Sequence, residues 1–70
     1  MKVGEIIKKI KYDSELTQTE IAAILGCSQV TISRIRRGLQ FPSTSLLLKM
    51  IKLANKYGNK VTVDDIFLKN

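Results

Sequence analysis

Four side chains in one short basic segment have the chemistry needed to read DNA bases. Arg34 can donate two parallel hydrogen bonds to O6 and N7 of guanine, and Gln29 can pair with N6 and N7 of adenine. Val30 and the methyl group of Thr31 can contact the methyl group of thymine. Single exposed valines are also ordinary on protein surfaces, so the alternative is that Val30 is a surface residue with no role in binding. The set indicates contact with base edges in a major groove.

A helix over residues 28–37 places these side chains on one accessible side. Ile32 and Ile35 then define the direction of the core. The side chains that point away from the core, or lie on its flanks, are Gln29, Val30, Thr31, Ser33, Arg34 and Arg37. This arrangement is typical of a recognition helix, whose N-terminal half and outward face reach the bases.

The preceding residues predict a second short helix. Thr17 is a natural N-cap, and Glu20 three residues later completes a capping box. Gly26 lies where this helix must stop and the chain must reverse. Two short helices joined by a tight turn make a helix-turn-helix, which we place at about residues 17–37.

Phosphate contacts are expected at both ends of this motif. Thr17 and Gln18 lie at the start of a helix, where free N–H groups and the positive end of the helix dipole attract anions. Arg37 lies just past the recognition helix and suits a phosphate, and Ser33 can bind another.

The rest of the chain predicts three further helices. Residues 2–12 carry apolar side chains at helical spacing, and Ser43 to Ser45 offer a cap for a helix of about a dozen residues. Residues 63–68 predict a short helix, with a strand as the weaker alternative. We therefore expect residues 1–70 to form one all-α domain, a compact bundle of about five short helices.

The composition favours an anionic partner and argues against several other functions. Twelve Lys and Arg against six Asp and Glu give a net charge of +6. This charge suits nucleic acid as a partner; the alternative is that it serves only to keep a small protein soluble. One cysteine, Cys27, and no histidine exclude an internal disulfide and the usual zinc ligands. We expect Cys27 to be a small buried side chain rather than a reactive thiol. We expect no metal and no cofactor.

The chain also lacks the patterns of a membrane protein or an enzyme. Its longest apolar run, Leu46 to Leu48, is far shorter than the roughly 20 residues of a membrane span. The first residues lack a signal peptide, so we expect no membrane association and a cytoplasmic location. No nucleophile–base pair or Gly-rich phosphate loop is present, so we expect no enzymatic activity.

The stretch from Leu16 to Gly38 resembles the helix-turn-helix of lambda-repressor-like proteins, the Cro/CI (XRE) type of phage and bacterial regulators. The matching residues are Gln18, Glu20, Ile21, Ala22, Gly26, Ile32, Ile35 and Gly38. The resemblance implies a bundle of about five helices that binds palindromic operator DNA as a homodimer. It also implies that Gln18 contacts a phosphate, that Ser28, Gln29, Val30 and Arg34 face bases, and that Ser33 and Arg37 lie along the DNA backbone.

One pair of residues departs from the family pattern. Relatives often join the first helix to the end of the third by an Arg–Glu ion pair, and the corresponding residues here are Lys11 and Arg36. Two cations do not form that pair. We therefore expect Arg36 to be solvated, to bind an acid such as Asp13 or Glu15, or to contact DNA.

The sequence thus predicts a double-stranded DNA-binding transcription regulator, foremost a homodimeric repressor. Residues 60–70 are the candidate dimerisation segment, with Phe67 and Leu68 as interface residues, because a short terminal helix cannot bury its whole circumference in its own domain. Phe41 is a further candidate for the interface, whereas we expect Ile66 to pack in the core. Contact with RNA polymerase stays open. The alternative is an antitoxin-type protein-interaction module that also binds DNA.

Overall fold

The computed structural model describes residues 2–67, and this part of the chain forms helices and no strand. The helices are α1 (Val3–Ser14), α2 (Gln18–Leu25), α3 (Gln29–Arg36), α4 (Thr44–Lys56) and α5 (Val63–Phe67). The predicted all-α fold with five helices is confirmed. The last segment is a helix, so the strand alternative is wrong.

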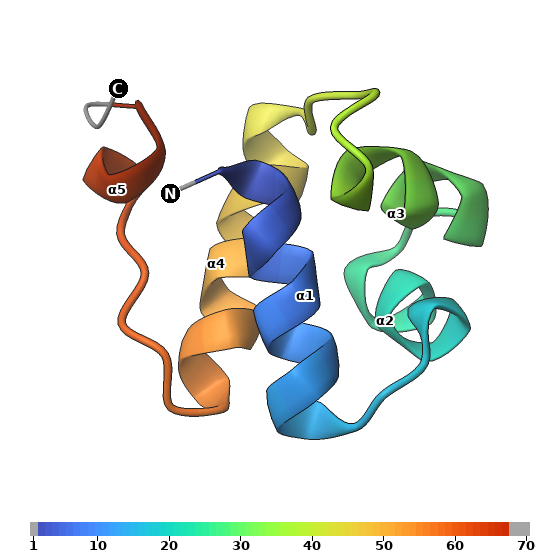
Figure 1. Ribbon diagram of the computed structural model, residues 1–70, viewed down its shortest axis with the longest axis horizontal. Coiled ribbons are helices and arrows are strands. Elements are labelled where there is room, and N and C mark those ends of the chain that lie inside the picture. Colours follow the sequence, from blue (N-terminus) through green and yellow to red (C-terminus); the bar gives the residue numbers. More distant parts are fainter. Residues whose placement is uncertain (1, 68–70) are drawn as a thin grey trace.

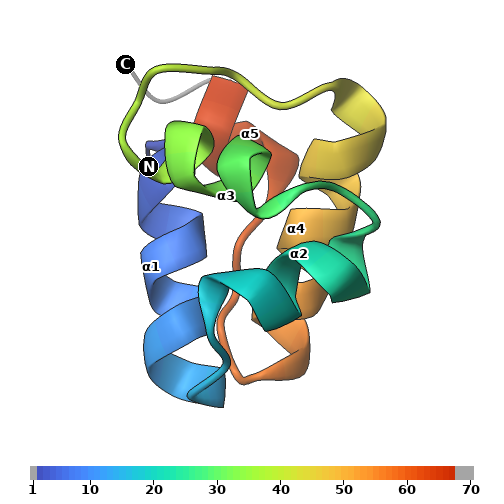
Figure 2. The same ribbon diagram turned by 90° about the vertical axis from the view of Figure 1, so that its right-hand side faces the viewer.

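Helix α1 lies at the centre of the arrangement. It packs beside α4 on one side and against α3 on the other, and α2 contacts both α3 and α4 (Figure 1). Turning the molecule by 90° brings α2 and α3 to the front, with α1 and α4 behind them (Figure 2). The helix-turn-helix therefore forms one outer side of the molecule, and α5 lies on the opposite side.

Isoleucine dominates the core that holds these helices together. Every helix from α1 to α4 buries one face and leaves the other in water, as its apolar spacing predicts. The buried side chains are Ile6, Ile7, Ile10, Ile21, Ala22, Leu25, Ile32, Ile35, Leu47, Met50, Ile51, Leu53, Ala54 and Val61. Because β-branched side chains have few rotamers to lose, they pack into one defined arrangement. This packing fixes the position of α3 against α1.

The predicted helix starts are confirmed. The Thr17 hydroxyl oxygen accepts a hydrogen bond from the Glu20 N–H at 3.1 Å, and the Glu20 carboxylate accepts one from the Thr17 N–H at 2.9 Å. Ser43 caps α4 by accepting from the Leu46 N–H at 3.2 Å. These bonds satisfy N–H groups that have no partner within the helix, and so they set where each helix begins.

Helix α1 runs two residues beyond its predicted end at residue 12. Ser14 accounts for the extension, because its hydroxyl donates to the Ile10 carbonyl and accepts from the Leu16 N–H. The helix then ends at Glu15, which has a left-handed backbone with φ 61°. A glycine is the usual residue at such a position, and its absence explains why the sequence pattern placed the end too early.

Two asparagines hold the segment between α4 and α5. The Asn55 amide donates to the Val61 carbonyl at 3.0 Å and accepts from the Val61 N–H at 2.8 Å. The Asn59 amide donates to Asp13 at 2.7 Å and to the Ala54 carbonyl at 3.2 Å. The chain beyond α4 is therefore tied back to α4 and to the end of α1, which brings α5 alongside the start of α1.

Candidate nucleic-acid interface

The outward side of α3 carries the side chains that the sequence predicts there. Ile32 and Ile35 are buried, whereas 60% of Val30 is exposed. Ser28, Gln29, Arg34 and Arg37 are also exposed, and Thr31 and Ser33 are half-buried at the sides of the helix. The structure thus gathers the candidate base-reading residues on one accessible surface, with Thr31 and Ser33 at its margins.

A hydrogen bond between two glutamines connects α2 to α3. The Gln29 amide nitrogen donates to the Gln18 amide oxygen at 2.9 Å, across eleven residues of sequence. Gln29 keeps one N–H and its oxygen, which is the donor–acceptor pair that adenine requires, and Gln18 keeps both N–H groups for a phosphate oxygen. This bond fixes the relative position of a predicted phosphate contact and a predicted base contact.

Ser28 and Thr31 also form a pair, at the start of α3. The Ser28 hydroxyl oxygen accepts from the Thr31 N–H at 3.1 Å and lies 2.9 Å from the Thr31 hydroxyl. The Ser28 hydroxyl therefore serves first to cap the helix, and the Thr31 hydroxyl is paired with it. The Thr31 methyl group and the one hydroxyl hydrogen that this pair leaves unused are what these residues can still offer to a base.

Predicted phosphate contacts lie at the two ends of the motif. Thr17 caps α2 with its hydroxyl oxygen, which leaves the hydroxyl hydrogen for a phosphate. At the other end, Gly38 has φ 78°, and the Leu39 N–H donates to the Arg34 carbonyl at 2.9 Å. A left-handed glycine of this kind ends a helix sharply. Arg37 is thereby held at the end of α3, where its side chain is exposed.

The charge around this surface is mainly positive, and the one acid of the helix-turn-helix, Glu20, lies in the first turn of α2. No Asp or Glu occurs between Glu20 and Asp64, and this stretch contains seven cations, three of them the arginines at 34, 36 and 37. A polyanion approaching α3 therefore meets no acid from residues 21–63. Such a field attracts DNA and raises its association rate.

Arg36 does not form either of the ion pairs suggested for it. It is half-buried beside α1, where it lines a hollow together with Lys8, Lys11, Tyr12, Asp13 and Glu15. Within the described residues no acid pairs with it, and its buried Nε has no hydrogen-bond partner. Asp13, the first candidate partner, instead accepts from Asn59.

Cys27 lies in the turn between α2 and α3 and is half-buried against the core, rather than fully buried as predicted. Burial raises the pKa of its thiol, and the nearby Lys49 charge offsets this only in part.

Because the thiolate is the reactive form, we expect iodoacetamide to modify Cys27 several-fold more slowly at pH 8 in the folded protein than in denaturant. Mass spectrometry over time measures both rates; equal rates would contradict a shielded thiol.

Two further features lie near this surface. A Cβ atom at Gly4 would lie 2.7 Å from the Arg36 carbonyl oxygen, so glycine allows α1 to approach the end of α3 closely. A lone glycine in an amphipathic helix is a signal for such an approach. Leu39 and Phe41 form the other feature, on the loop after α3, where more than half of each side chain is exposed.

The remaining predictions for this part of the chain concern metals, membranes and the C-terminus. The described residues contain no cluster of three or more potential metal ligands. None of their helices has the length and apolar character needed to cross a bilayer. Of the two predicted interface residues, Leu68 and the side chain of Phe67 lie outside the described residues.

Comparison with known proteins places the chain in a family. The helix-turn-helix family matches residues 7–61. The chain is 35% identical over 65 residues to the ImmF control region 10 kDa protein of Bacillus phage phi105, an alignment that covers 93% of this chain and 72% of that protein. No solved structure matches the chain. The chain therefore belongs to the Cro/CI (XRE) type of helix-turn-helix proteins, a family of DNA-binding transcription regulators.

Proposed function

We propose that this protein is a transcriptional repressor that binds a palindromic operator as a homodimer. The observation that carries the proposal is the outward surface of α3, where Gln29, Val30 and Arg34 are exposed and the Gln18–Gln29 hydrogen bond at 2.9 Å holds Gln29 in place. The phage relative adds support, because its name assigns it to a control region. Two copies would place their α3 helices in successive major grooves, about one turn of DNA apart.

Each predicted residue has a role in this complex. Bases are contacted by Ser28, Gln29, Val30, Thr31 and Arg34, and phosphates by Thr17, Gln18, Ser33 and Arg37. Arg34 contributes most to specificity, because an arginine that forms two hydrogen bonds with guanine excludes the other bases at that position. Val30 and Thr31 add the apolar contacts that favour thymine. The bound dimer covers a promoter in the cytoplasm and excludes RNA polymerase from it.

Selection of bound sequences from a random double-stranded DNA library tests this function. We expect the wild-type chain to enrich a palindrome, and Arg34→Ala to lose preference for one guanine in each half-site, at a cost of about 1–3 kcal/mol in binding free energy. Lys56→Ala is the matched control, since it removes an exposed cation at the far end of α4 and is expected to keep the same preference. Selection that enriches no sequence at moderate salt would contradict the proposal.

A further inference from the structure

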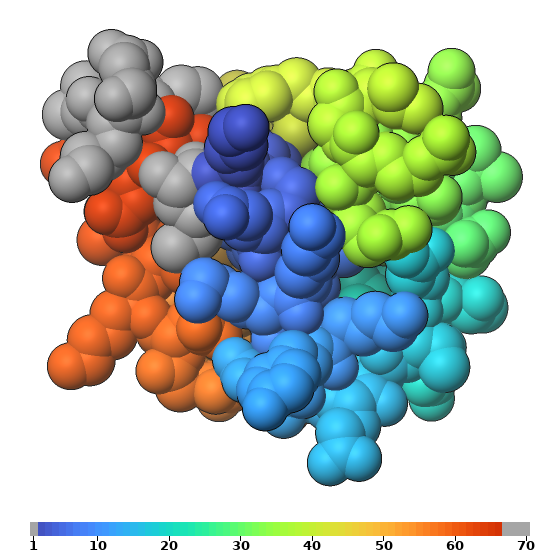
Figure 3. Space-filling view, viewed as in Figure 1, coloured from blue at the N-terminus to red at the C-terminus, as the bar shows by residue number. Residues whose placement is uncertain are grey.

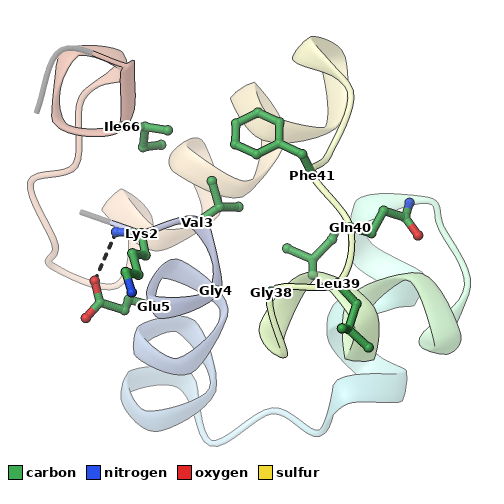
Figure 4. Close-up of a pocket in the computed structure, with 10 residues that line it drawn as sticks. Lys2, Val3, Gly4, Glu5, Gly38, Leu39, Gln40, Phe41 and Ile66 are labelled. Carbon is green, nitrogen blue, oxygen red and sulfur yellow. Dashed lines mark hydrogen bonds between the residues drawn. The ribbon is translucent and has the colours of Figure 1, made fainter. Parts of the chain in front are cut away.

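A hollow with a positive lining, here called the basic hollow, lies between α1 and the end of α3. It is lined by Lys8, Lys11, Tyr12, Asp13, Glu15 and Arg36. On the face of the molecule seen in Figure 3, α1 and the end of α3 lie side by side. The basic hollow shares no residue with the apolar groove in which Val3, Phe41 and Ile66 point toward one another (Figure 4). None of the predicted DNA contacts lines it, so it is a separate surface.

The Arg36 side chain brings hydrogen-bond donors to this hollow that no described residue accepts from. Its Nε is buried without a partner, and of its unpaired nitrogens only Nε is enclosed. The terminal nitrogens therefore stay accessible at the wall of the hollow. A buried donor without a partner is rare in folded proteins, because it loses its bonds to water and gains none in exchange. An anion in the hollow would stabilise this charge.

Two lysines of α1 lie close to Arg36. Lys8 and Lys11 are three residues apart, so they occupy the same side of the helix. The last residue of α3 is held against α1, because even a Cβ atom at Gly4 would lie 2.7 Å from the Arg36 carbonyl oxygen. Three cations thus converge on one opening, and none of them forms an ion pair with a described residue. Their mutual repulsion favours the binding of an anion between them.

Two acids also line the basic hollow, and neither is paired with the three cations. The Asp13 carboxylate accepts a hydrogen bond from the Asn59 amide at 2.7 Å, which ties it to the segment beyond α4. Glu15 is exposed at the left-handed residue that ends α1. Three cations against two acids leave the lining positive. The acids oppose a bound anion, and this opposition provides one of the tests below.

We propose that the basic hollow binds a phosphate oxyanion, either free inorganic phosphate or the phosphate group of a small molecule such as a nucleotide. The fork of the Arg36 guanidinium matches two phosphate oxygens, and Lys8 and Lys11 add charge from α1. Because three cations meet there, a dianion gains more than a single carboxylate does. Tyr12, which is 85% exposed and lines the same hollow, offers a ring on which an attached base can stack.

Titration with inorganic phosphate at pH 7 tests the site, with ionic strength held constant by sodium chloride and backbone amide shifts followed by NMR. We expect saturable shifts centred on residues 8–12 and 36. Arg36→Gln is expected to lower the affinity at least roughly ten-fold. Lys11→Gln, which alters an exposed side chain and so leaves the fold intact, is expected to lower it roughly three-fold or more. Lys9→Gln is the matched control, because Lys9 is an exposed cation of α1 that does not line the hollow.

Adenosine monophosphate and adenosine distinguish the two sources of phosphate. If an organic phosphate is the ligand, adenosine monophosphate binds more tightly than inorganic phosphate, and Tyr12→Ala removes the difference. If inorganic phosphate is the ligand, adenosine monophosphate binds no more tightly. Either order supports an oxyanion site. Adenosine that binds as tightly as its monophosphate would overturn the inference, because the base would then carry the binding.

Glu15→Gln separates an anion site from an internal ion pair. Removing a negative charge beside the hollow is expected to raise the affinity for phosphate roughly two-fold or more at low salt, and to leave the Tm in sodium chloride unchanged. If Arg36 instead pairs with Glu15 in solution, the substitution lowers the Tm and does not raise the affinity. That result would contradict the proposed site.

The remaining outcomes separate the basic hollow from the DNA-reading surface. Arg34→Gln removes an arginine that does not line the hollow, and it is expected to keep the wild-type affinity for phosphate. Loss of binding in Arg34→Gln but not in Arg36→Gln would place the anion on the outward side of α3 and overturn the inference. Shifts that never saturate, or that sodium chloride reproduces, would do the same. Operator selection is measured without these ligands, so either proposal can fail while the other stands.

Discussion

Replacing Ile32 with alanine is expected to lower the free energy of unfolding by about 2–5 kcal/mol, the usual cost of emptying part of a tightly packed core. Ile32 is fully buried between α3 and the rest of the core. At roughly 0.05–0.15 kcal/mol per residue, a domain of this size has only about 4–10 kcal/mol in total. The substitution therefore removes a large share of the stability, and urea unfolding followed by circular dichroism measures it.

Val30→Ala is the control for this change, because Val30 lies two residues away on the exposed side of the same helix. We expect it to change stability by no more than about 0.5 kcal/mol, as surface substitutions usually do. On the proposed function it weakens DNA binding instead. Equal losses of stability in the two variants would contradict the placement of α3, since the two faces of the helix would then be equivalent.

Gly4→Ala is expected to destabilise the protein by about 1–3 kcal/mol, as overpacking of a tight contact does. Alanine favours a helix over glycine by about 1 kcal/mol, so helix propensity alone would give the opposite sign. The added Cβ, however, would lie 2.7 Å from the Arg36 carbonyl oxygen and 3.1 Å from that of Ile35. Both atoms belong to the backbone of α3, which cannot move away as a flexible side chain can.

Thermal unfolding measures this effect, with Lys9→Ala as the control on the exposed side of α1. We expect a clear fall in Tm for Gly4→Ala and little change for Lys9→Ala. A rise in Tm for Gly4→Ala would show that α1 and α3 are further apart than described. The same contact sets the position of α3, so the variant also tests how the candidate interface is supported.

Periodicity and capping rules predicted most of the fold and the exposed side of α3. Ile32 and Ile35 establish which side of α3 is buried, and Thr17 with Glu20 establishes where α2 begins, because both are local properties of the chain. Such rules do not predict the hydrogen bond between Gln18 and Gln29, because this bond depends on the angle at which α2 and α3 cross. The tight approach at Gly4 and the anchoring of residue 61 by Asn55 are likewise contacts between separate segments.

The uneven distribution of acids gives the protein an electric dipole moment. Residues 21–63 contain seven cations and no acid, whereas the six acids, together with the other five cations, lie in the segments before and after them. These outer segments form α1, the first turn of α2 and α5, and α5 lies on the side of the molecule opposite α3 (Figure 1). In the field of a DNA duplex we therefore expect the molecule to turn before contact, with α3 leading and α5 trailing. On the proposed function, a larger fraction of its collisions with DNA then begins with α3 facing the duplex.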